Sequence, residues 1–114
     1  MSDAPFDRAS FLQRVGDAID AARDVSQAFT GDVTRRIDTL TRALDHGDLA
    51  GARHHAHAIK GAALDVSAAP LARAAAAIER AARAEDLAAA RATLPSVVAA
   101  FDELVPALLA AWPD

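Results

Sequence analysis

The sequence has 114 residues, the size of one compact domain with a single core. It contains no cysteine, which excludes disulfides and thiolate metal sites. Its formal net charge is -4 with both signs interspersed, so no basic face indicates binding to nucleic acid.

Neither a membrane span nor an export signal is predicted. The longest apolar run, Leu104–Trp112, is interrupted by Pro106 and is far shorter than the roughly 20 residues that cross a bilayer. The opening letters MSDAPFDR lack a basic segment followed by an apolar one. We therefore expect one cytoplasmic domain over residues 1–114, with no membrane partner.

Apolar residues recur with a period near 3.6 in every long segment and never alternate as in a strand, which predicts an all-α fold. A short first helix is expected from Phe6 to Val15. A long second helix is expected from about Asp17 to Asp45. Its inward stripe comprises Val25, Phe29, Val33, Ile37, Leu40 and Leu44. After it, Gly47 suits the left-handed position that ends a helix, and Asp48 suits the N-cap of the next.

Three further helical segments follow. The third is expected from Leu49 to about Leu64, and the fourth from about Pro70 to Ala84. The buried seam of the third comprises Leu49, Ala52, Ala56, Ile59 and Ala63. The last segment has apolar residues seven apart at Leu87, Leu94, Phe101 and Leu108, reinforced by Val97, Val98, Leu104 and Val105. Pro95 and Pro106 are expected to kink or divide it.

Long amphipathic segments joined by short junctions favour antiparallel neighbours. The expected architecture is an up-down-up-down antiparallel four-helix bundle with a short additional N-terminal helix. Because one chain supplies all four bundle helices, we expect a monomer.

The stretch HHAHAIKGAAL, residues 54–64, concentrates the chemistry of the chain. Successive helical residues are about 100° apart, so with Ile59 inward, His57 falls at the edge of the buried seam. His54 lies one turn before it, and Lys60 and Gly61 lie one turn after it. The result is an imidazole beside a cation.

Gly61 needs a physical reason, because glycine inside a helix costs about 1 kcal/mol relative to alanine. One reason is clearance for another molecule beside His57, and the other is close packing of a neighbouring backbone. Neutral imidazole is a nucleophile whose phosphoryl adduct is labile enough to pass the group onward. The ammonium of Lys60 would offset the charge of that adduct.

The chain has no GxxxxGK[ST] loop, no kinase glycine loop and no carboxylate cluster suited to Mg²⁺. These absences make direct transfer from ATP implausible and favour a phosphoryl carrier over an enzyme. No cofactor is expected in this chain.

The segment His57–Ala63 resembles the signature of the histidine-containing phosphotransfer (HPt) domains of bacterial phosphorelays: His, any residue, an aliphatic residue, Lys, Gly, then small residues. The resemblance extends from FDRASFLQRVGD through LDHGDLAGARHHAHAIKGAA to LARAAAAIERAARAEDLAAARATLP. It implies that His57 accepts the phosphoryl group, Lys60 stabilises it and Gly61 gives a partner access to it.

The resemblance further implies a phosphorelay intermediate. His57 would reversibly accept a phosphoryl group from a receiver-domain aspartate and pass it to another receiver domain. The partners would be response-regulator receiver domains and a hybrid histidine kinase, with Mg²⁺ bound by the partner receiver. Arg53 and His54, beside His57, are expected to contribute to partner binding.

The sequence departs from the family pattern at Glu79 and in the segment after the third helix. Family members often place a glutamine on the next helix to hydrogen-bond the active imidazole, where this chain has Glu79. A carboxylate could orient the ring but would oppose its phosphorylated form unless it points away. After the third helix the family often has a polar residue and then a glycine, where this chain has Asp65 and Ser67.

Two other functions remain open from the sequence. His54 and His57, or His46 with one of them, have a spacing that could share a metal, although no HExxH pattern or carboxylate pair completes a ligand set. A helical adaptor that binds partners through the same face without chemistry is the second alternative.

Overall fold

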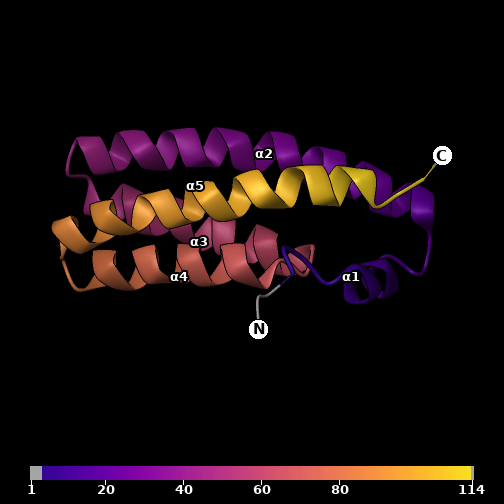
Figure 1. Ribbon diagram of the computed structural model, residues 1–114. Coiled ribbons are helices and arrows are strands. Elements are labelled where there is room, and N and C mark those ends of the chain that lie inside the picture. The colour runs from indigo at the N-terminus through magenta and orange to yellow at the C-terminus, as the bar shows by residue number, and fades with distance from the viewer. Residues whose placement is uncertain (1–3, 114) are drawn as a thin grey trace.

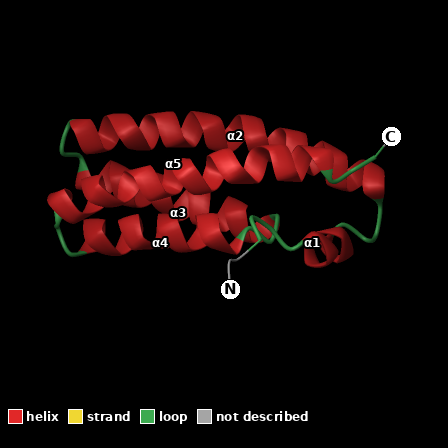
Figure 2. Cartoon of the chain, viewed as in Figure 1, coloured by secondary structure: helices red, strands yellow, loops and turns green. Residues whose placement is uncertain are grey.

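The computed structural model describes residues 4–113, which form five helices and no strand (Figure 1). The helices are α1 (Arg8–Arg14), α2 (Ile19–Asp45), α3 (Leu49–Asp65), α4 (Ala69–Arg83) and α5 (Leu87–Ala110). Short loops join them, as Figure 2 shows. The predicted boundaries lie close to the observed ones, most closely for α3.

Helices α2 to α5 run alternately up and down, and each packs against its neighbour in the chain. Helix α5 also lies beside α2, which closes the bundle. The short helix α1 lies near the end of the bundle where α5 finishes (Figure 1). The predicted all-α fold, a four-helix bundle with a short additional N-terminal helix, is confirmed.

Capping side chains and left-handed residues at the helix ends determine where the helices begin and where the chain turns. The side chains of Asp7, Asp48 and Asp86 each accept a backbone N–H in the first turn of the helix that follows. Gly47 has a φ of +70°, so its predicted left-handed position is confirmed. Ser67 takes the same conformation after α3, with a φ of +58°, in a position where glycine would be less strained. The turn after α3 therefore forms without a glycine.

Four of the five residues expected in the buried seam of α3, namely Ala52, Ala56, Ile59 and Ala63, are fully buried, whereas Leu49 at the start of the helix is only half-buried. The stripe predicted for α2 is wrong at its first member. Val25 is 38% exposed, and Ser26 is buried beside it instead. The Ser26 hydroxyl donates to the Ala22 carbonyl at 2.7 Å and accepts the indole N–H of Trp112 at 2.8 Å. A buried hydroxyl with both bonds satisfied is tolerated in a core.

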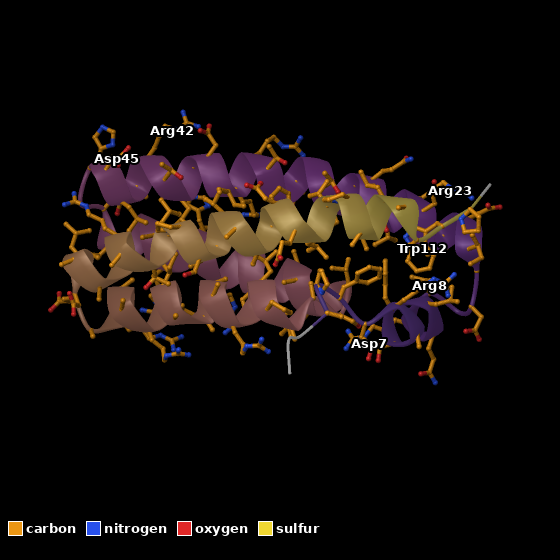
Figure 3. The ribbon with its side chains drawn as sticks, viewed as in Figure 1. Asp7, Arg8, Arg23, Arg42, Asp45 and Trp112 are labelled. Atoms are coloured by element: carbon orange, nitrogen blue, oxygen red, sulfur yellow. The ribbon has the colours of Figure 1, made fainter. Side chains whose placement is uncertain are left out.

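Aromatic packing joins α1 to the C-terminal segment, where Trp112 lies close to Arg8 (Figure 3). Trp112 is buried, and its ring meets that of Phe11 edge-on with 5.4 Å between centroids. The guanidinium of Arg8 lies 5.0 Å from the centre of the indole. The Arg8 Nε also donates to the Ala111 carbonyl at 3.3 Å.

The two prolines do not divide α5, which runs unbroken through Pro95 and Pro106. Both prolines are exposed, so water can reach the carbonyls that lose their helical partners. The predicted inward position of Val98 is wrong, because its side chain is 37% exposed.

Helix α5 is also long and apolar enough, by length and composition alone, to cross a membrane. It packs against α2 and α4, and its inner face contributes Ala90, Val97, Phe101, Leu104 and Leu108 to the core. The core helices of soluble proteins pass the same test, so the property is weak evidence for a span.

The buried seam of α3 determines which residues of that helix face solvent, and Ile59 is the largest of its fully buried side chains. Replacing Ile59 by alanine is expected to lower the free energy of unfolding by about 2–5 kcal/mol, through lost burial and the cavity left behind. Urea denaturation followed by Trp112 fluorescence measures this loss. A loss below about 1 kcal/mol would contradict the placement of Ile59 in the core.

Candidate functional site

His57 lies on the outer side of α3, where the buried seam of that helix gives way to solvent. Its side chain is 65% exposed. The ring Nδ1 lies 2.9 Å from the Oε2 atom of Glu79 on α4. One ring nitrogen is thus held by the protein while the imidazole remains accessible to a second molecule.

Glu79 is the buried member of the site, with only 3% of its surface exposed. Its Oε1 atom accepts a hydrogen bond from Lys60 Nζ at 2.7 Å. Its Oε2 atom lies 2.9 Å from His57 Nδ1 and accepts a hydrogen bond from an Arg83 guanidinium nitrogen at 3.0 Å. One carboxylate therefore connects two residues of α3 with one of α4.

The hydrogen bond from Lys60 lowers the pKa of Glu79, and the contact with His57 acts in the same direction, against the raising effect of burial. The carboxyl group is therefore ionised at neutral pH and has no proton to donate. It follows that His57 Nδ1 carries the hydrogen of the His57–Glu79 bond when the imidazole is neutral. The lone pair of the neutral ring is then on Nε2.

The charges around Glu79 bear on whether a carboxylate at this position would oppose the phosphorylated form of His57. Glu79 points toward the imidazole, so its charge acts on anything bound to the ring. Lys60 and Arg83, however, each contact one of its two oxygens. With the imidazole neutral, two cations face one anion, and the cluster has a surplus of positive charge.

Gly61 is exposed one turn after His57. A Cβ atom added to it would meet no atom outside its own helix turn within 4 Å. Close packing of a neighbouring backbone therefore does not explain this glycine. Clearance beside the imidazole, the other reason that the sequence suggests, stays a prediction.

A shallow depression adjoins His57 between α3 and α4. Its lining residues are Ala50, Arg53, His54, His57, Glu79 and Arg83. Arg53 and His54 are both exposed there, which puts them within reach of a partner that contacts His57. Their role in binding stays a prediction.

On the other side of α3, an apolar groove runs between α2 and α3. Its lining residues are Val25, Ala28, Phe29, Asp32, Ala62, Asp65 and Val66. Leu64, seven residues after His57 and so on nearly the same face of the helix, is 49% exposed. His57 therefore lies between a depression with cationic residues and a surface with exposed apolar ones.

Of the residues that the sequence singled out, the structure brings His57, Lys60 and Glu79 into direct contact. Arg83 was missed. The spacing in the sequence could have indicated it, because Arg83 follows Glu79 by four residues and such pairs lie on one helix face.

His46 lies apart from the site and contacts the Arg42 carbonyl through Nδ1 at 2.7 Å. Within residues 4–113, no three potential metal ligands of the His, Cys, Asp or Glu type gather at one place.

The lowered pKa of Glu79 has a consequence for stability. A carboxyl group whose pKa is lower in the folded state stabilises the fold above its ordinary pKa, and this contribution is lost as pH falls through the folded value. Between pH 7 and pH 3, wild-type protein should therefore lose more unfolding free energy than the Glu79→Gln variant. Urea denaturation of both proteins at the two pH values measures the difference. Equal losses would contradict this charge state.

Comparisons with known proteins show the family of the chain and a protein of similar fold. Residues 24–111 match the Hpt domain family. The structure superimposes on that of the histidine-containing phosphotransfer protein B from Pseudomonas aeruginosa PAO1 with a TM-score of 0.87. That match covers 94% of this chain and 93% of the other, at 25% sequence identity. No curated protein sequence matches the chain significantly.

Proposed function

Because the chain belongs to the Hpt domain family, we propose that it is a phosphorelay intermediate that carries a phosphoryl group on His57. The group arrives from the phosphorylated aspartate of one receiver domain and leaves, reversibly, to the aspartate of another. The observation that supports this most directly is the exposed imidazole whose Nδ1 is held by an ionised Glu79.

The transfer step follows from the position of the hydrogen on the neutral imidazole, which leaves the lone pair on Nε2. The Nε2 lone pair attacks phosphorus, a P–N bond forms, and the P–O bond to the receiver's aspartate breaks, which releases that residue as a carboxylate. The imidazole ring gains positive charge in this step. Glu79 stabilises that charge through its contact with Nδ1, and reversal of the same steps returns the group to an aspartate.

Lys60 is placed to act on the phosphoryl group by charge. Its Nζ atom lies on the same side of α3 as His57 and contacts the carboxylate that His57 contacts. An ammonium is a compact point charge with no fixed fork geometry, so it can attract phosphoryl oxygens while remaining near Glu79. Lys60 can therefore pair with Glu79 in the resting protein and attract the phosphoryl oxygens in the phosphorylated protein.

The surface around His57 suits a transient docking partner. Val25 and Leu64 supply exposed apolar area on α2 and α3. Arg53 supplies charge at the edge of the depression on the other side of His57. A mostly apolar centre with a charged rim is typical of reversible protein interfaces. We propose that a receiver domain docks here and that Gly61 leaves room for it.

The remaining features of the proposal concern the setting of the reaction. Members of the Hpt domain family carry phosphoryl groups, and we propose that this chain has no ATP site of its own and receives the group from a hybrid histidine kinase through a receiver domain. Mg²⁺ would be bound by the receiver. We also propose that the protein acts as a cytoplasmic monomer.

The direct test is transfer of labelled phosphoryl group from a phosphorylated receiver domain. The wild-type protein should acquire acid-labile label, and the His57→Gln variant should acquire none, because no other imidazole has the same contacts. His46→Gln is the matched control and should keep the label. Label that persists in the His57→Gln variant would contradict the assignment of His57 as the phosphoryl acceptor. Wild-type protein that stays unlabelled with several competent receivers would favour the adaptor function.

Gly61 offers a test in which stability and function move in opposite directions. Gly61→Ala should raise the free energy of unfolding by about 0.5–1 kcal/mol, since the helix gains alanine and the new Cβ meets no atom. The rate of transfer from a receiver should nevertheless fall, because the methyl group occupies the docking space.

Gly31→Ala is the matched control for that variant. Gly31 lies inside α2, where an added Cβ would meet only the Arg35 guanidinium at an ordinary 3.7 Å. The Gly31→Ala variant should gain similar stability and should accept the phosphoryl group at the wild-type rate. If Gly61→Ala also transferred at the wild-type rate, clearance would no longer explain the glycine.

A further inference from the structure

We infer that Arg83 is a positioning residue for phosphoryl transfer, acting through Glu79 rather than on the phosphoryl group itself. This inference rests on the proposed function. The structure assigns Arg83 the task of neutralising the carboxylate oxygen nearest the reactive ring, so that the phosphorylated ring does not face an uncompensated negative charge.

The two oxygens of Glu79 have different partners. Oε1 contacts Lys60 at 2.7 Å. Oε2 is shared between His57 Nδ1 at 2.9 Å and the Arg83 guanidinium at 3.0 Å. Arg83 is therefore the cation on the oxygen that the reactive ring uses.

The arrangement also fixes the carboxylate in space. Lys60 approaches it from α3 and Arg83 approaches it from its own helix, α4, one turn later. With a cation on each oxygen, rotation of the carboxylate would break two ion pairs. The direction in which Glu79 presents Oε2 to His57 thus depends on Arg83 as well as on Lys60.

Phosphorylation makes this compensation necessary. The phosphoryl group brings negative charge to a ring whose other nitrogen already contacts an ionised carboxylate. Glu79 attracts the positive ring through Nδ1 but repels the negatively charged phosphoryl oxygens on the other ring nitrogen. Without Arg83, the shared oxygen would keep its full negative charge, and the stronger repulsion of the phosphoryl oxygens would destabilise the adduct. The adduct should then lose its group to water or to a receiver more readily. Because the Arg83 side chain is 54% exposed, solvent limits the effect to a few-fold.

The experiment compares Arg83→Gln, Arg83→Lys and Arg80→Gln. Arg80 is an exposed arginine of the same helix about 100° around from Glu79, and so serves as the matched control. Two quantities are measured: the equilibrium distribution of phosphoryl group between this chain and a receiver domain, and the half-life of isolated phosphorylated protein. Circular dichroism verifies that each variant folds.

Arg83→Gln should shift the distribution toward the receiver and shorten the half-life, each by about threefold to fivefold. Arg83→Lys should recover most of both, and Arg80→Gln should stay within about twofold of wild type. In the unphosphorylated protein, Arg83→Gln should also move the Nδ1 resonance of His57 in ¹⁵N NMR spectra. A merely structural arginine would not affect that signal selectively.

Repeating the Arg83→Gln change in a Glu79→Gln background separates the two ways in which Arg83 could act. Action through the carboxylate predicts that the change has little effect there, because no carboxylate charge remains to neutralise. An equal loss in both backgrounds would overturn the inference and indicate direct contact with the phosphoryl group or the receiver.

The inference and the proposed function can fail separately. Wild-type protein that accepts no phosphoryl group from any competent receiver would overturn the proposed function and this inference with it. Wild-type protein that accepts the group, with Arg83→Gln unchanged in distribution, half-life and Nδ1 resonance, would overturn the inference alone.

Discussion

The site depends on one buried carboxylate held between two helices. A buried, ionised Glu79 would be costly if it were unpaired, and its pairing requires donors from both α3 and α4. His57 and Lys60 reach it from α3, and Arg83 reaches it from α4. The contact is therefore possible only where these two helices pack closely, and they form the most extensively packed pair in the bundle. Helix packing and the charge state of the site are thus parts of one arrangement.

As a result, the surroundings of His57 differ on its two sides. Toward α4 its Nδ1 is held by a cluster of charged groups, and toward α2 the surface becomes an apolar groove. The ring is fixed by the first side, while the second leaves apolar surface that a partner can cover. Gly61 lies between these regions, with open space where a side chain would be. The charged cluster and the apolar groove therefore lie on different sides of His57, and a substitution in one of them need not disturb the other.

Periodicity was sufficient to predict the helices and four of the five expected members of the α3 seam, because small and apolar residues there recur with little ambiguity. It failed at Val25, since a hydrophobic pattern favours valine over the neighbouring Ser26, whose burial depends on a hydrogen bond from distant Trp112. Glu79 was found only through resemblance to a family. Arg83 was missed because an arginine four residues after a glutamate usually indicates an ordinary exposed ion pair. Only the structure shows that His57 uses the same carboxylate oxygen.

The many alanines of the chain explain how a glutamate can reach across the interface at all. Alanine fills much of the buried face of both α3 and α4. The buried alanines include Ala52, Ala56 and Ala63 on α3 and Ala72, Ala75 and Ala82 on α4. Small side chains let helix axes approach, and Glu79 can then meet His57 at 2.9 Å from the next helix. Larger residues would bury more apolar area but would separate the helices. The distance between Nδ1 and the carboxylate would increase even if the bundle still folded, so the seam is constrained by the site as well as by the core.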